Sequence, residues 1–236
     1  MTRSPIWKDI ADTLTAEIAQ GHYAPGDRLP TEALLAARFG VNRHTVRHAF
    51  SALTAAGLVH ARRGAGVFVA AKPADYALGR RVRFHQNIAA SGRTPSRQLL
   101  RLETRPADLR EAAALVLAEG ALVHVVEGVS LADGMPLAVF RSVFPAARFA
   151  GLLDVLAQTQ SVTAAMAACG VVDYTRASTT VTATAARATQ AVLLRVADGA
   201  PLLRSVSVNV DDAGVPVEFG TTWFAGDRVT LTVTPD

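Results

Sequence analysis

The sequence predicts an α+β protein of two domains: an N-terminal winged helix-turn-helix and a C-terminal antiparallel sheet with helices. Between Glu32 and Asp75 there is no acidic residue, although Arg, Lys and His recur there within a regular apolar pattern. From residue 84 onward β-branched strand patterns dominate, and Asp133-Gly134 is a strong hairpin signal between two of them. Short sequence signals also recur about 80 residues apart in this second half, which suggests two similar units.

The basic stretch begins with a predicted helix from Thr31 to about Phe39. The Thr31 hydroxyl can accept a hydrogen bond from a backbone N–H at the start of that helix. Gly40 supplies the left-handed conformation that ends it. The apolar positions fall at helical spacing: Leu34, Leu35 and Phe39. The short glycine turn that follows is typical of a helix-turn-helix.

A second predicted helix begins after Asn42, which can cap it, and closes at Gly57. Its buried stripe consists of Val46, Phe50 and Leu53. Its basic face has two parallel rows, Arg43 with Arg47 and His44 with His48, because residues four apart share one side of a helix. An arginine fork can bond guanine at two points or hold a phosphate, so double-stranded DNA is the predicted partner.

Two short strands, 58–61 and 67–70, are predicted to follow as a hairpin. The connecting turn contains Arg62 and Arg63 beside Gly64 and Gly66, and these glycines allow close approach to another backbone. Arginines at such a tip can enter a minor groove or bond phosphates. We therefore interpret this hairpin as the wing. An ordinary solvated basic surface is the alternative.

Composition limits the remaining possibilities. Half of the 236 residues are hydrophobic, and the net charge of +4 arises mostly within residues 1–75. Cys169 is the single cysteine, which excludes an internal disulfide and a cysteine-cluster metal site. Neither a signal-peptide core nor an uninterrupted apolar run of membrane-spanning length is present. We expect a soluble, cytoplasmic protein without metal or cofactor.

The domain boundaries are predicted as 1–71 for the DNA-binding domain, 72–83 for a linker, and 84–236 for the second domain. Helices are expected within the second domain at 107–118, 161–169 and 185–195. Strands are expected at 122–131, 135–144, 174–184, 202–210, 215–224 and 229–233. The recurring sequence signals predict that each of the two units consists of a helix, a turn and a β-hairpin. Two such units side by side predict an antiparallel sheet with a ligand cleft at the seam.

The first domain resembles the winged-helix domain of GntR-family transcriptional regulators. The resemblance begins at Pro5-Ile6-Trp7-Lys8, continues through 23–32, and ends at Gly64-Ala65-Gly66-Val67-Phe68-Val69. The family's DNA contacts, together with the basic face and turn, imply this binding set: Thr31, Asn42, Arg43, His44, Thr45, Arg47, Arg62, Arg63, Gly64 and Gly66. Ala33 departs from the pattern, because many members carry an arginine there, and operator preference is expected to differ.

Residues 84–233 resemble the effector-binding domain of the HutC subfamily, which has a chorismate-lyase-like fold. The order of motifs is most similar to that of phosphonate-metabolism regulators, and three segments carry it: 83–87, 173–176, and 218–219 with 224–229. The resemblance implies a small, anionic effector, such as a phosphonate or a phosphorylated sugar.

The effector-binding set expected from these motifs and from anion chemistry contains eight residues: Arg83, Asn87, Arg141, Ser142, Ser161, Tyr174, Arg176 and Glu218. Arg176 is the expected clamp for the anion, and Glu218 the reader of an amine or hydroxyl. Ser161 can instead be only a helix cap, and Tyr174 only a core aromatic. Glu127 stands where the subfamily carries an arginine, which leaves room for a zwitterionic or aminated ligand.

These features favour a ligand-responsive regulator, in particular a repressor acting as a homodimer on an inverted-repeat operator. Its effector is a small anion or, alternatively, a non-phosphorylated amino-acid catabolite. A lyase-like enzyme is a remote alternative, because only His85 and His124 fall in the second domain and the familiar catalytic motifs are absent. A purely architectural DNA-binding protein is the third reading.

Overall fold

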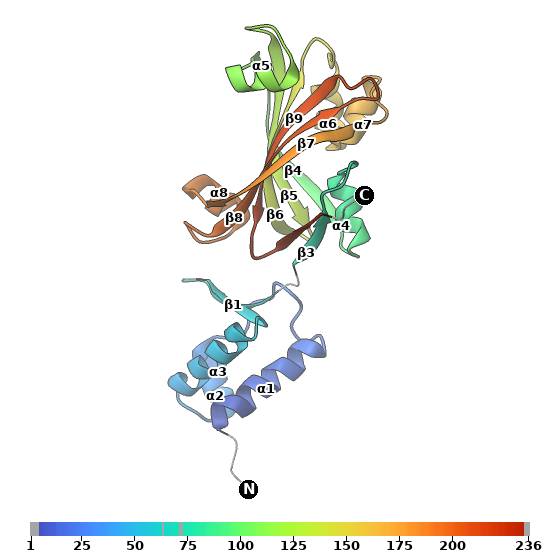
Figure 1. Cartoon of the computed structure of the whole chain (residues 1–236). Helices are drawn as coiled ribbons and strands as arrows, with labels where there is room; N and C mark the ends of the chain where they lie inside the picture. Colours follow the sequence, from blue (N-terminus) through green and yellow to red (C-terminus); the bar gives the residue numbers. More distant parts are fainter. Residues whose placement is uncertain (1–4, 63, 71–72, 234–236) are drawn as a thin grey trace. The chain divides into compact units, whose positions relative to one another are not determined.

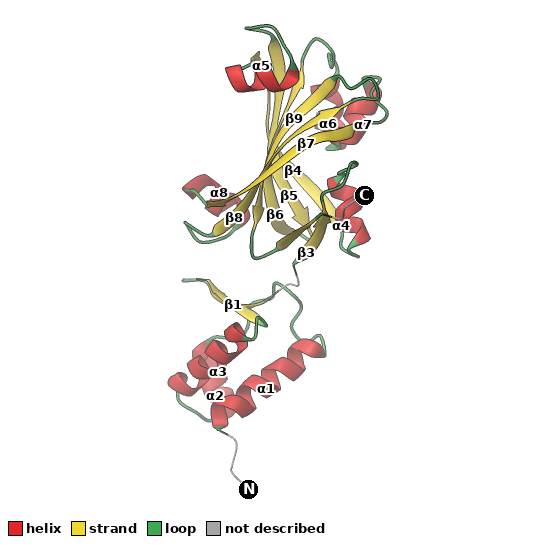
Figure 2. Ribbon diagram, in the orientation of Figure 1, coloured by secondary structure: helices red, strands yellow, loops and turns green. Residues whose placement is uncertain are grey.

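The computed structural model describes residues 5–62, 64–70 and 73–233, and the chain divides into two compact units, Met1–Lys72 and Pro73–Asp236 (Figure 1). The first unit is mostly helical, whereas strands dominate the second (Figure 2). Each has hydrophobic clusters of its own. Within the described part of the chain, no helix is long and apolar enough to cross a membrane.

The first unit contains three helices and a hairpin: α1 (Ile6–Ala19), α2 (Glu32–Phe39), α3 (Arg43–Ala55), β1 (Val59–Arg62) and β2 (Gly66–Val69), the strands pairing antiparallel. The predicted caps are present. Thr31 Oγ1 accepts a hydrogen bond from Leu34 N at 3.3 Å, and Gly40 ends α2 at φ 63°. The predicted winged helix-turn-helix is therefore confirmed.

The core of the first unit joins all three helices and the hairpin. The predicted stripe of α3 is buried, and Leu14 of α1 is fully enclosed. Leu35 is buried, whereas Leu34 is 63 % exposed, so the apolar spacing of α2 did not distinguish the two residues. Neighbouring residues on a helix point in different directions, and the short α2 turns only one narrow face inward.

The second unit is built on one six-stranded antiparallel sheet in the order β4-β5-β6-β9-β8-β7. Its strands are β4 (Pro95–Pro106), β5 (Leu122–Ala132), β6 (Met135–Pro145), β7 (Thr175–Ala185), β8 (Pro201–Val210) and β9 (Pro216–Ala225). The expected repeat is present. Each repeated unit is longer than predicted, because it also includes the strand that precedes its helix. The units are β4-α5-β5-β6 and β7-α8-β8-β9, and they meet where β6 pairs with β9.

Helices pack against both faces of this sheet, and strand alternation decides which residues they cover. On one face α5 (Leu109–Leu115) packs near Val143, and α8 (Ala188–Leu194) packs near Val139. On the other face α4 (Phe84–Ala90), α6 (Leu152–Thr159) and α7 (Val162–Ala168) pack near Phe140, Phe144 and Ala138. From Ala138 to Phe144, odd and even positions of β6 therefore belong to different layers.

The range 72–83, expected to be a linker, belongs mostly to the second unit. It contains β3 (Ala74–Ala77), which pairs in parallel with β10 (Val229–Thr232). Ala74 and Tyr76 are buried while their neighbours are exposed, and four residues of alternation are too short to stand out in a sequence. Helix α4 likewise occupies a segment expected to begin the strands, and α6 was not predicted.

A close contact at Gly128 allows the packing of the sheet to be tested. A Cβ at this position would lie 2.5 Å from the Gln98 carbonyl oxygen and 2.8 Å from Phe140 Cζ. We expect Gly128→Ala to lower the free energy of unfolding by about 1–3 kcal/mol through overpacking. Gly79→Ala is the matched control, because nothing lies within 4 Å of its Cβ. If denaturant unfolding finds the two variants equally stable, the close packing of Gly128 against Gln98 and Phe140 would be contradicted.

Candidate nucleic-acid interface and ligand cavity

The start of α3 is held by a local hydrogen-bond pair. Asn42 Oδ1 accepts from Thr45 N at 2.9 Å and from Thr45 Oγ1 at 3.0 Å, so both side chains are fixed at the helix N-terminus. Arg43 and His44 are exposed beside them. This end of α3 thus combines oriented backbone N–H groups with free basic side chains, which suits contact with a polyanion.

Arg47 is held by Glu32 of α2. Its Nε and NH2 donate to the two carboxylate oxygens at 3.0 and 2.8 Å. The hydrogen bond from Arg47 lowers the pKa of Glu32 below its usual value. Because the Nε–NH2 edge is used by Glu32, the NH1–NH2 end is the one that can meet a base or phosphate. Sequence analysis selected Arg47 but missed Glu32, whose only signal is that it directly precedes the basic stretch.

The wing has two glycines that need their conformations for different reasons. Gly64 adopts φ 74°, and no atom lies within 4 Å of the position a Cβ would take. Gly66 adopts φ 115°, and a Cβ there would lie 2.7 Å from Arg28 Nε. Gly66 therefore accommodates Arg28 as well as the turn. The expected contacts of the Arg62 side chain and of Arg63 lie outside the described residues.

A cavity of about 220 Å³ lies in the second unit, where the central strands meet α4, α7 and β3. Its floor on the sheet is hollow because small side chains face it: Ser130, Ala138, Ser142, Ser207 and Gly220. Six of the eight residues expected in the effector site line this cavity: Arg83, Ser142, Ser161, Tyr174, Arg176 and Glu218. The cavity spans the seam between β6 and β9, as the repeat predicted.

Glu218 organises the polar floor of the cavity. Its Oε1 accepts from Ser142 Oγ and its Oε2 from Asn209 Nδ2, both at 2.6 Å. The Asn209 Oδ1 in turn accepts from Arg176 Nε at 2.8 Å. The Glu218 carboxylate is therefore held by two neutral side chains, and one of them, Asn209, also holds the Arg176 guanidinium. Asn209 was not predicted; it directly opposes Glu218 across the β8–β9 pair.

A second cation, Arg83, also lines the cavity. The Arg83 guanidinium is 3.4 Å from the centroid of the Tyr174 ring, and NH2 donates to the Tyr174 carbonyl at 2.8 Å. Asp173 lies 3.3 Å from the same nitrogen. Tyr174 OH meets Thr163 Oγ1 at 3.2 Å, and Ser161 Oγ caps α7 by accepting from Ala164 N at 3.2 Å. Tyr174 and Ser161 thus have structural partners as well as cavity positions.

The sequence analysis missed Arg97, which lies on β4 opposite Ser130. The guanidinium sits 4.8 Å from the Phe140 ring centroid and 5.6 Å from that of Phe84. Its Nε is buried without a hydrogen-bond acceptor among the described residues, and burial lowers the pKa of the guanidinium. The repeat could have revealed Arg97, because it precedes Arg176 by about 80 residues.

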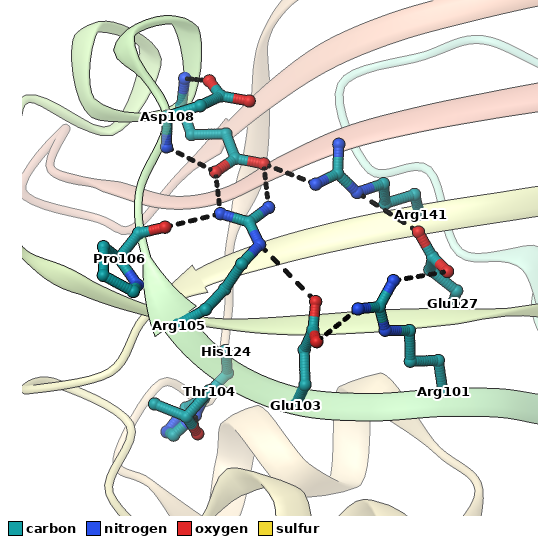
Figure 3. A network of polar contacts seen from close by, with 10 residues as sticks. Arg101, Glu103, Thr104, Arg105, Pro106, Asp108, His124, Glu127 and Arg141 are labelled. Atoms are coloured by element: carbon teal, nitrogen blue, oxygen red, sulfur yellow. Dashed lines mark hydrogen bonds and ion pairs between the residues drawn. The ribbon is translucent and has the colours of Figure 1, made fainter.

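Two expected effector residues do not line the cavity. Arg141 follows the alternation of β6 to the other face, where its NH2 donates to Glu111 at 2.8 Å and its Nε lies 3.4 Å from Glu127 (Figure 3). The Asn87 side chain donates to the Ala77 carbonyl at 3.1 Å. Neither residue belongs to the lining of the cavity. Glu127, which shares the face of Arg141, therefore gives no reason to expect an aminated ligand.

The network around Arg141 is structural. Glu111 is 1 % exposed, accepts two hydrogen bonds from Arg105 at 2.7 Å, and completes the capping box of α5 with Asp108. Burial alone would raise the pKa of Glu111, but the hydrogen bonds from Arg105 and from the Asp108 backbone leave it below its usual value. A buried carboxylate so compensated fixes α5 on the sheet.

A winged helix-turn-helix joined to a sheet with an arginine-lined cavity is the architecture of a transcriptional regulator with an effector domain. A family model described as "Bacterial regulatory proteins, gntR family" matches residues 7–69, and one described as "UTRA domain" matches residues 90–230. This chain belongs to the GntR family of transcriptional regulators, and its second unit is a UTRA effector domain.

Individual relatives agree with this family. The chain is 41 % identical to the "Uncharacterized HTH-type transcriptional regulator RB1450" of Rhizobium meliloti (strain 1021), covering 97 % of this chain and 94 % of that protein. It is 30 % identical to the "Histidine utilization repressor" of Pseudomonas putida, over 58 % of this chain and 55 % of that one. The crystal structure of PhnF from Mycobacterium smegmatis aligns with a TM-score of 0.66 at 28 % identity, over 98 % and 99 % of the two chains. These relatives are regulators, and the chain is not an enzyme.

The unsatisfied Nε of Arg97 can be tested without a ligand. An enclosed N–H donor that lacks an acceptor is unfavourable, so we expect Arg97→Met to raise the free energy of unfolding by about 1 kcal/mol. Arg105→Met provides the contrast, because it removes a partner of buried Glu111 and should cost about 1–3 kcal/mol. Urea unfolding of both variants measures the difference. A loss of stability in Arg97→Met equal to that in Arg105→Met would show that Arg97 has a structural role.

Proposed function

We propose that this regulator is a repressor that binds an inverted-repeat operator as a homodimer and is controlled by a small anionic metabolite. The single observation that carries the effector part is Arg97, a half-buried cation that lines the cavity and whose enclosed Nε has no hydrogen-bond acceptor among the described residues. A protein does not gain stability from such a group, so its position is explained by a ligand that supplies the missing anion.

The DNA part of the proposal follows from α3. In a helix-turn-helix the second helix enters the major groove with its N-terminal residues toward the bases. Arg43, His44 and Arg47 are exposed on that end of α3, and Arg47 is oriented by Glu32. A single recognition helix reads a short half-site, and two copies related by a two-fold axis read an inverted repeat. In such a dimer the two DNA-binding domains can adopt more than one relative arrangement, and a ligand that binds one arrangement more tightly favours it.

The chemistry of the cavity supports an anion with a polar group at its other end. Arg83, Arg97 and Arg176 bring three guanidinium groups to the lining, while Glu218 stands on the floor between Ser142 and Asn209. Guanidinium forks match phosphonate or phosphate oxygens, and the carboxylate suits an amine or hydroxyl. We propose a phosphonate or sugar-phosphate-like effector. A non-phosphorylated amino-acid catabolite is the alternative, because a carboxylate can occupy the same arginines.

The role of Arg47 in DNA recognition predicts a specific loss. Arg47→Ala should weaken binding to the operator by about 1–3 kcal/mol, the usual magnitude for a base-reading arginine. Fluorescence anisotropy with a labelled operator fragment at fixed salt measures this change. Arg110→Ala, an exposed residue of the second unit, is the control for loss of one positive charge. Equal affinities for the two folded variants would remove Arg47 from the proposed contact set.

The effector class is tested by thermal denaturation with three kinds of probe: phosphonates, phosphorylated amino sugars and amino-acid catabolites. A ligand that binds only the folded state raises its stability by about 2.7 kcal/mol at a hundred times its Kd, so Tm increases. Arg97→Met and Arg176→Ala should abolish that increase, whereas Arg101→Met, outside the cavity lining, should retain it. Stabilisation that survives both cavity variants would rule out this cavity. A response confined to catabolites without phosphorus would favour the alternative effector.

A further inference from the structure

The wing of the first unit includes an extended segment that precedes α2 in the sequence. Residues 26–29 run antiparallel to β2, and Leu29 N donates to the Val67 carbonyl at 2.8 Å. Next to this hydrogen bond, Arg28 forms an antiparallel bridge with Phe68. The backbone of this segment therefore fixes Arg28 to the wing, although the sequence analysis placed no DNA contact here.

The side chain of Arg28 belongs to the outer face of the wing. Leu29 is 1 % exposed and points into the core of the first unit, so the preceding residue points the other way, and Arg28 is exposed. Phe68, opposite Arg28, lies on the same face and is only half-buried. The Arg28 guanidinium therefore lies on a surface of the wing that the hydrophobic core does not cover.

Gly66 determines where the guanidinium lies. A Cβ at Gly66 would be 2.7 Å from Arg28 Nε and 3.3 Å from both Cζ and NH2, so the guanidinium packs directly against the glycine. A residue with a side chain would prevent this close approach. Gly66 is the first residue of β2, beside the turn of the wing. Packing thus holds a long side chain at the wing tip, which reduces the conformational entropy that it loses on binding.

The charge of Arg28 differs from that of two other arginines of the first unit in having no acidic partner. Arg38 pairs with Glu17, and Arg47 pairs with Glu32. Among the residues that the structure describes, no carboxylate lies within ion-pair distance of Arg28. A guanidinium that is positioned by packing and free of an acidic partner is available to an anion from outside the chain.

We propose that Arg28 binds a backbone phosphate of double-stranded DNA next to the tip of the wing. The proposal rests on the DNA-binding surface proposed above and adds a residue outside the helix-turn-helix and the turn. A base contact needs an arginine that reaches into a groove, whereas the Arg28 side chain lies along the wing against Gly66. Phosphates line the outside of the groove, and contacts to them fix the position of a protein on the duplex.

Salt dependence tests this contact without knowledge of the operator. Each phosphate that a protein neutralises contributes about 0.9 to the slope of log Kd against log salt concentration. Arg28→Met should reduce that slope by about 0.9 for each bound copy, so its loss of affinity should be about threefold greater at 50 mM salt than at 200 mM. Fluorescence anisotropy of the full chain with a labelled mixed-sequence duplex measures this change. Arg110→Met, at an exposed position of α5, is the matched control and should keep the wild-type slope.

A second substitution separates the charge of Arg28 from its packing. Arg28→Lys keeps the positive charge, so it should retain most of the slope, and the Tm of the free protein should be unchanged in both variants. An unchanged slope in Arg28→Met would overturn the phosphate contact. A reduced slope together with a lower Tm in both variants would give Arg28 a structural role in the wing and would also overturn it.

A duplex that the wild type selects from a random pool separates a phosphate contact from a base contact. Arg28→Met should weaken binding to the selected and the mixed-sequence duplex by the same factor, because a phosphate carries no sequence information. A loss confined to the selected duplex would show that Arg28 reads a base and would overturn the proposal. A wild type that binds neither duplex would instead refute the proposed DNA-binding surface as a whole.

Discussion

The pairing of β6 with β9 is the constraint on which the second unit depends. Its register sets Ser142 opposite Gly220 and Phe140 opposite Thr222, and thereby decides which side chains face the cavity. A shift of one residue would exchange the two faces of a strand. It would then bring the Arg141 side of β6 toward the cavity and send Ser142, with its hydrogen bond to Glu218, to the α5 side. The cavity and its lining are thus a consequence of strand register at the centre of the repeat.

The two faces of the sheet differ in how their enclosed charged groups are compensated by partners. On the α5 side Glu111 is matched by Arg105, Arg141 and the backbone of Asp108, so that its charge contributes to holding the fold. On the cavity side the Arg97 guanidinium lies near the Phe140 and Phe84 rings, and its Nε has no hydrogen-bond acceptor among the described residues. A buried ion pair that is satisfied within the protein stabilises the fold, whereas an enclosed cationic nitrogen without an acceptor is the feature on which our proposal of an anionic ligand rests.

Local signals made much of the fold predictable. The caps at Thr31 and Asn42, the Asp133-Gly134 hairpin and the repeat each act over a few residues or recur in the sequence, and the winged domain and the antiparallel sheet followed from them. Which face a strand residue occupies depends instead on distant partners. Strand alternation places the adjacent Arg141 and Ser142 on opposite faces, but no local pattern in this apolar strand tells which of the two faces holds the cavity. Arg97 and the short strand β3 were missed for the same reason, because the position of each depends on pairing with a strand distant in the sequence.

The parallel pairing of β3 with β10 has a consequence for the order in which the protein can be completed during synthesis. The residues of β3 emerge from the ribosome among the first of the second unit, yet β10 is more than 150 positions further on, at Val229–Thr232. Tyr76 of β3 lines the cavity, so this wall cannot be finished until nearly all of the described chain has been translated. The first unit has no such requirement, because its hairpin pairs within Val59–Val69. Domains that need only local pairing can fold while translation continues. A nascent chain can therefore carry a finished DNA-binding head well before it can sense a ligand.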